Sequence, residues 1–169
     1  LKSYEIYLGK LLTFVTFAIL EAIVAGVGAI TLLGVYTVHP VMFVFYCIFV
    51  SIVFAVIVYT AASLLDDVGK SMIVVLLVLQ LAGTGGTFPI QVAPEIFQKI
   101  YIYLPFTYAI SGMREIVGGI VYEILIKDII YLCIYMVGSL IIGLLLKRLL
   151  NKLIEPLLKK LYASGILKH

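Results

Sequence analysis

The sequence has few charged residues for its length. Charged side chains make up 12% of its 169 residues and hydrophobic side chains 64%, whereas a soluble domain carries about 25% charged and about 45–50% apolar residues. A soluble fold of this size could not hide so much apolar surface, because a large share of any small domain stays in contact with water. The shortage of charge therefore predicts a protein embedded in lipid.

The sequence also lacks the side chains that catalysis and metal binding need. Its two cysteines, Cys47 and Cys133, lie deep in apolar runs, and His39 and His169 are far apart with no nearby nucleophile. We expect the cysteines to be small core residues. The glycine-rich run at 83–87 lacks the lysine of an ATP-binding loop. We therefore expect no enzyme activity, no cofactor and no metal site on this chain.

Apolar runs long enough to cross a membrane make up most of the sequence. A spanning helix needs about 20 predominantly apolar residues. The His39-Pro40 pair separates two such runs because proline cannot continue a helix interior, and a polar loop at 66–70 precedes a third. We expect an all-α integral membrane protein with about four transmembrane helices, at 11–38, 41–65, 71–88 and 129–146.

The positions of the basic residues predict the orientation, since Lys and Arg are retained in short cytoplasmic loops. With both termini in the cytoplasm, only Lys99, Arg114 and Lys127 of the 12 basic residues lie outside. The cytoplasmic parts are then a lead-in at 1–10 and a tail at 148–169, on either side of a transmembrane domain at 11–147.

The tail has leucines on one face and cations on the other, the pattern of an amphipathic helix on an anionic membrane surface. Pro156 is expected to kink this helix. A docking helix for a cytoplasmic partner is the alternative interpretation. No basic patch lies elsewhere and no nucleic-acid motif is present, so we expect no nucleic-acid partner.

The segment at 89–127 is rich in proline and aromatic residues. Pro94 and Pro105 each stand where a short helix could begin, and Gly118-Gly119 would end the second helix. These two helices are too short and polar to span, and their Tyr and Phe residues suit the headgroup interface. We expect an outer re-entrant helical hairpin. Arg114-Glu115 at its mouth is interpreted as a local ion pair or as a contact with substrate or headgroup.

Glu21 is the one ionisable residue well inside an expected span, where a charged group is costly. Ala18, Ala22 and Gly26 recur beside it at a spacing of four, which gives a face suited to close helix contact. Glu21 is therefore expected to point into the bundle or across a subunit interface. Its role is either structural, as a protonated or hydrogen-bonded residue, or that of a pathway residue.

The runs GTGGTFPIQ at 83–91 and LPFTYAISGMRE at 104–115 resemble the C-terminal membrane domain of the YhgE/Pip (phage infection protein) family. That family is similar to the permeases of type-2 ABC exporters, in which a small-residue and proline motif is followed by a re-entrant hairpin with a Pro-x-Thr element. Phe88-Pro89 and Pro105 to Thr107 match these features. The resemblance implies six spans, of which the last four lie here, and places a coupling helix for an ATPase at 1–10.

The resemblance implies the permease domain of an ABC type-2 exporter-like protein in a bacterial plasma membrane. It would form a homo- or heterodimer through membrane helices, act with a separate ATPase, and move a hydrophobic or envelope substrate outward. The alternative is a non-transporting membrane anchor, a phage receptor or secretion-machinery scaffold. The candidate pathway or gating residues are Glu21, Gly83, Gly85, Gly86, Pro89, Pro105, Arg114 and Glu115. The candidate coupling residues are Lys2, Tyr4, Glu5 and Lys10.

Overall fold

The computed structural model describes the backbone of residues 3–84 and 90–163, and the side chains of 4–64, 73–84 and 90–146. Within these ranges every regular element is helical, which confirms the expected all-α class. In chain order the elements are α1 (Ser3–Thr31), α2 (Pro40–Gly83), η1 (Ile90–Val92), α3 (Glu95–Ile100), η2 (Tyr101–Tyr103), α4 (Pro105–Gly118) and α5 (Tyr122–Ala163).

Three helical segments are long and apolar enough to cross a membrane, namely Tyr4–Thr31, Pro40–Leu64 and Tyr122–Leu146. The described part of the fourth expected span is a shorter apolar helix, Ile73–Gly83. Each of the three long segments contains an 18-residue apolar stretch. Only 17%, 22% and 11% of these stretches, respectively, are buried inside the chain. Most of their side chains therefore face outward, where lipid tails are as apolar as leucine.

The ends of the first two helices differ from the expected spans. α1 stops at Thr31 instead of continuing to residue 38. Gly34 follows with a φ of 65°, and this left-handed conformation, which glycine adopts at little cost, is typical of a helix C-terminus. α2 then begins at Pro40, as the His39-Pro40 pair predicts. The connection between the two helices is therefore longer than a tight turn.

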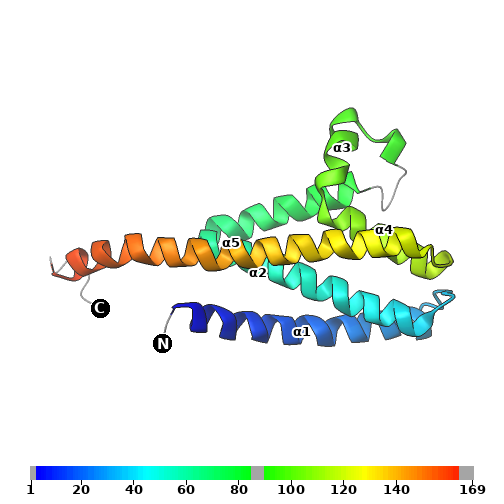
Figure 1. The fold of residues 1–169 in the computed structure, drawn as a ribbon, viewed down its shortest axis with the longest axis horizontal. Coiled ribbons are helices and arrows are strands. Elements are labelled where there is room, and N and C mark those ends of the chain that lie inside the picture. The colour runs from blue at the N-terminus through cyan, green and yellow to red at the C-terminus, as the bar shows by residue number, and fades with distance from the viewer. Residues whose placement is uncertain (1–2, 85–89, 164–169) are drawn as a thin grey trace.

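α2 continues as helix through the stretch 66–70, which was expected to be a polar loop. That stretch contains one glycine and no proline, so nothing in it prevents helical hydrogen bonding. Figure 1 shows that α2 nevertheless changes direction, and that its second half returns toward α4. A cavity of about 120 Å³ lies between the two halves, and its lining includes Phe54, Ile57, Leu77, Gln80 and Phe106.

The small-residue face of α1 packs directly on α2. Ala22 and Gly26 are buried, and a Cβ atom added to Gly26 would lie 3.6 Å from the Sγ atom of Cys47. The Ser51 hydroxyl donates a hydrogen bond of 2.9 Å to the Ala18 carbonyl. These contacts confirm the close helix approach that the spacing of small residues predicts.

Tyr7 joins α1 to α2 and α5 at the end of the bundle where α1 begins. It is 1% exposed, and its hydroxyl lies 2.7 Å from the Oγ1 atom of Thr60. The Tyr59 hydroxyl donates to the Tyr7 carbonyl at 3.1 Å. The expected lead-in at 1–10 is therefore helical from Ser3 onward as part of α1, and Tyr7 packs it against the bundle.

We expect Gly143→Ala to destabilise the bundle, because the new Cβ would overlap the Tyr7 hydroxyl and lie 3.0 Å from the Cγ2 atom of Thr60. Overpacking of this kind costs about 1–3 kcal/mol. The matched control is Gly138→Ala on the same helix, where the added Cβ meets nothing within 4 Å. Thermal unfolding in lipid nanodiscs measures both. Equal melting temperatures for the two variants would contradict the close packing at Gly143.

Candidate functional site

The segment between α2 and α5 forms the helical hairpin that the sequence predicts. α3 and η2 follow Pro94 and end at Tyr103, and α4 begins at Pro105 and ends at Gly118. Gly119 has a φ of 127°, which separates α4 from α5. α5 already begins at Tyr122, so the hairpin is shorter than the expected 89–127. No helix-breaking residue follows Gly119 in this stretch, and the chain therefore re-enters a helix at once.

The corner of the hairpin is fixed by three hydroxyl groups. Thr107, Tyr108 and Tyr135 donate hydrogen bonds of 2.7, 2.7 and 2.9 Å to the backbone carbonyls of Tyr101, Ile102 and Tyr103, respectively. Each residue of η2 therefore has its carbonyl satisfied by a side chain. These bonds satisfy backbone acceptors that the interruption of the helix leaves free, and they thereby stabilise the break between α3 and α4.

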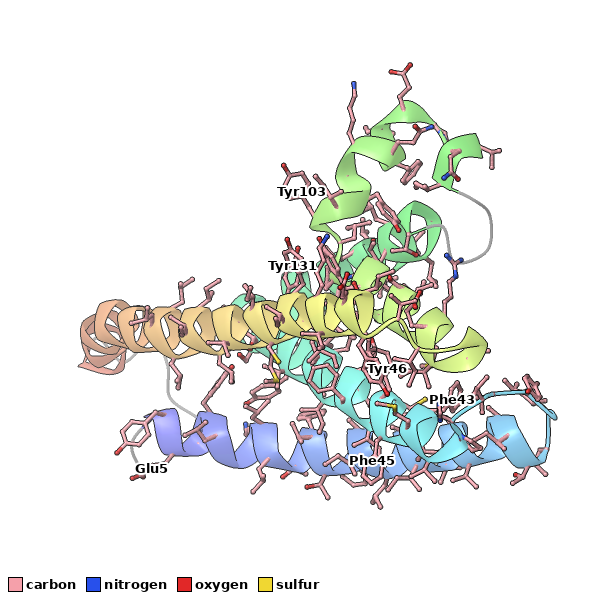
Figure 2. All side chains as sticks on the ribbon, turned by 45° about the vertical axis from the view of Figure 1, so that its right-hand side comes forward. Glu5, Phe43, Phe45, Tyr46, Tyr103 and Tyr131 are labelled. Carbon is pink, nitrogen blue, oxygen red and sulfur yellow. The ribbon has the colours of Figure 1, made fainter. Side chains whose placement is uncertain are left out.

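Aromatic stacking attaches the hairpin to α5. The ring of Tyr108 stacks on Tyr131 with 4.5 Å between centroids and an angle of 19° between planes. Figure 2 shows Tyr103 of the hairpin above Tyr131. Burial raises the pKa of the Tyr108 hydroxyl above its ordinary value, so this group stays protonated and donates a hydrogen bond at neutral pH.

α4 also packs closely on α2, where glycine allows the approach. A Cβ atom on Gly112 would overlap the Tyr46 hydroxyl and lie 2.6 Å from its Cζ atom. That hydroxyl donates to the Tyr108 carbonyl at 3.1 Å. Phe54 and Phe106 meet edge to face, with 5.5 Å between centroids. The hairpin is thus held by α2 on one side and by α5 on the other.

The structure places four of the candidate pathway residues in or beside this hairpin. A Cβ atom on Gly83 would lie 2.8 Å from the Cδ1 atom of Leu104, so the end of α2 touches the corner. Pro105 begins α4. Arg114 is exposed, and the Oε2 atom of its neighbour Glu115 accepts the Val121 N–H at 3.1 Å, next to the start of α5. The candidates Gly85, Gly86 and Pro89 lie outside the described residues.

The remaining candidates lie on α1, away from the hairpin. Glu21 is exposed and does not point into the bundle of this chain, which leaves a subunit interface as the other expected position. Tyr4, Glu5 and Lys10 are exposed near the beginning of α1. Figure 2 shows Glu5 at the lower left, where α1 begins, and Tyr103 on the other side of α5 from α1. The candidate Lys2 lies outside the described residues.

Asp128 is a polar residue of the site that the sequence reasoning missed. The expected hairpin at 89–127 and the expected span at 129–146 both left it out, but it lies within α5 and is 4% exposed. Ser111 of α4 lies close to its carboxyl group. The sequence spacing could have predicted this burial. Leu125, Asp128 and Leu132 share one face of a helix, and all three are buried.

The described residues contain no group of three or more His, Cys, Asp or Glu side chains that could hold a metal ion. Cys47 and Cys133 are free thiols of intermediate burial. The polar groups of the site are therefore hydroxyls, backbone carbonyls and single carboxylates. Such groups can bind protons or hydrogen-bonding ligands.

The chain matches a known protein family over the part that carries these helices. The family profile described as "ABC-2 family transporter protein" matches residues 1–145, which include the hairpin and the span of α5. The chain belongs to the ABC-2 transporter family. This membrane family, together with the three apolar helices, establishes a membrane-embedded protein with a permease-like domain.

The chain is also similar to the uncharacterised protein YhgE of Bacillus subtilis (strain 168), with 28% identity over 117 residues. The aligned part is 69% of this chain and 15% of that protein, so the chain spans a small fraction of the relative's length. No solved structure shows significant similarity to this ABC-2 family chain.

We expect Tyr135→Phe to loosen the hairpin, because it removes the hydrogen bond to the Tyr103 carbonyl. The loss of one such bond costs about 0.5–1.5 kcal/mol. Hydrogen exchange of the amides at 95–104 measures the effect. Tyr131→Phe is the matched control, since it keeps the ring stacked on Tyr108 and removes a hydroxyl that makes no hydrogen bond seen in the described part of the chain. Faster exchange in both variants, or in neither, would contradict the role of the Tyr135 hydroxyl.

Proposed function

We propose that the chain is the permease domain of an ABC type-2 exporter-like protein in a bacterial plasma membrane, acting with a separate ATPase. The observation that carries this proposal is the family match over residues 1–145, which covers the whole hairpin. ABC-2 permeases depend on an ATPase for energy, and this chain has no phosphate-binding loop of its own. We assign the ATPase to a separate subunit as part of this proposal.

The arrangement of the helices supports an orientation with both ends in the cytoplasm. α1 begins and α5 ends at the same end of the bundle, and the hairpin and the connection at 32–39 lie at the other end (Figure 1). A coupling surface formed by Tyr4, Glu5 and Lys10 then faces the ATPase. The hairpin faces the outside, where exported substrate leaves.

The cavity between the two halves of α2 supports a hydrophobic substrate. Its volume is about 120 Å³ and most of its lining is aliphatic or aromatic. Gln80 is the polar residue among those that line it, and the Oε1 atom of this side chain is buried without a hydrogen-bond partner among the described residues. An apolar molecule with one hydrogen-bond donor would match this lining.

The outer face of α1 supports the pairing of two permease subunits. Glu21 is exposed among Phe17, Leu20 and Val24, which are 67%, 55% and 74% exposed. A carboxylate facing lipid at this depth is costly, whereas a polar partner across an interface removes much of that cost. A second copy, or a related membrane subunit, would supply such a partner.

Purification of the full-length protein from its own membrane in mild detergent tests the exporter proposal. We expect a stoichiometric ATPase subunit to co-purify, with ATP hydrolysis that depends on the membrane domain. Recovery of the protein alone, or with secretion-machinery components, would contradict the proposal. That outcome would favour the membrane anchor, a role compatible with the small share of YhgE that the chain covers.

We expect Glu21→Gln to weaken subunit association and to lower membrane-domain-dependent ATP hydrolysis. Hydrogen bonds to charged groups are worth about 1.5–3 kcal/mol, so association should weaken by about tenfold or more. Glu95→Gln is the matched control, because Glu95 is a carboxylate on the solvent-facing side of α3. Dilution-dependent dissociation in detergent and ATPase assays measure both variants. Unchanged subunit dissociation and ATP hydrolysis in Glu21→Gln would contradict a role for Glu21 in the pathway or at the interface.

A further inference from the structure

A buried carboxyl group on α5 has no part in the function proposed above. Asp128 is 4% exposed and lies within the apolar segment Tyr122–Leu146. Tyr131, labelled in Figure 2, follows it by one turn of the same helix and lies beneath the hairpin. Asp128 is therefore at the hairpin end of the bundle, inside the protein and at the depth of a membrane span.

Three hydroxyl groups lie near the carboxyl group of Asp128. Ser111 of α4 carries one of them. Tyr46 and Tyr108 are also close to it, but their hydroxyls donate to the carbonyls of Tyr108 and Ile102. The Oδ2 atom of Asp128 has no hydrogen-bond partner among the residues that the structure describes. An ionised carboxylate would thus be left with an unsatisfied oxygen.

The charged groups near Asp128 come from α5 itself and from α4. Lys127 precedes it on α5 and is exposed, with its Nζ atom over an aromatic ring. α4 contributes a second carboxylate, Glu115, and the exposed Arg114. α2 contributes the hydroxyl of Tyr46. Asp128 takes part in no ion pair within the described part of the chain, and it faces another acid.

We propose that Asp128 is a proton-binding site that is occupied while α4 is packed against α5. A charged aspartate buried in a membrane helix is costly, and a buried acid without a counter-ion takes up a proton instead. The proton is bound at the carboxyl group and removes its charge. When α4 moves away from α5, Asp128 meets the outer aqueous phase and releases this proton to water.

Proton binding and the position of the hairpin are therefore linked. The packed hairpin holds one more proton than the displaced hairpin, so displacement releases a proton and a rise in pH favours it. With one proton released, the equilibrium constant for displacement rises by up to about tenfold per pH unit. This dependence requires no ATPase, so it can be tested whether or not the exporter proposal holds.

Hydrogen exchange of the α4 amides, Pro105–Gly118, tests the site in the full-length protein in lipid nanodiscs across a pH series. The variants are Asp128→Asn, which keeps a polar side chain of the same shape and cannot ionise, and Glu123→Gln. Glu123 is an exposed carboxylate in the first turn of α5 and serves as the matched control. In the wild type and in Glu123→Gln we expect protection of α4 to fall with rising pH, relative to Asp128→Asn.

Infrared spectra provide the second readout. We expect a protonated-carboxyl band that is present in the wild type and in Glu123→Gln, weakens as the pH rises, and is absent in Asp128→Asn. Identical pH dependence of α4 exchange in the wild type and in Asp128→Asn would overturn the proposal. If Asp128→Asn does not fold, the two measurements on the wild type alone test the proposal. Protection of α4 that does not change with pH relative to α1, or a spectrum without the band, would overturn it equally.

Discussion

Hydrogen bonds from three hydroxyls to three successive carbonyls of η2 are the constraint on which the rest of this site depends. A chain that turns interrupts its helix, and the backbone carbonyls that this frees need other hydrogen-bond partners. Thr107 and Tyr108 come from α4, whereas Tyr135 comes from α5. The bonds that satisfy the corner therefore also attach it to the last span. The Pro-x-Thr element has a physical explanation here, since Pro105 begins α4 and Thr107 bonds back to the corner.

Close packing at small residues is the second constraint. In lipid there is no hydrophobic driving force between helices, so their association depends on such packing. A Cβ atom at Gly26 would make ordinary van der Waals contact with α2, whereas Gly112 lets α4 receive the Tyr46 hydroxyl and Gly143 lets α5 receive the Tyr7 hydroxyl. At two of these contacts a tyrosine fills the space that a side chain would occupy. The hairpin and the opposite end of the bundle are thus held by the same combination of a glycine and a buried tyrosine. Asp128 is the polar exception, since its burial depends on α4 remaining in place.

Much of the fold could be predicted from particular residues. Pro94, Pro105 and Gly118-Gly119 set the ends of the hairpin helices, because proline and glycine act on the backbone locally. Predictions that relied on charges as boundaries were less accurate. The Asp and Lys residues at 66–70 did not interrupt α2, and the polar residues at 123–128 lie inside α5. A charged side chain does not break a helix, so charge marks where a helix leaves lipid more reliably than where it ends.

The sequence by itself determined the membrane class, the helical content, the hairpin and the family, because composition and backbone-restricting residues act without tertiary context. Only the tertiary structure decided which acidic residue is buried. Glu21, expected in the bundle or at an interface, is exposed, and Asp128, which lies outside both the expected hairpin and the expected last span, is enclosed. Helical periodicity shows which residues share a face. It cannot show which face meets another helix when nearly every face of the chain is apolar, and that choice is made by packing between α2, α4 and α5.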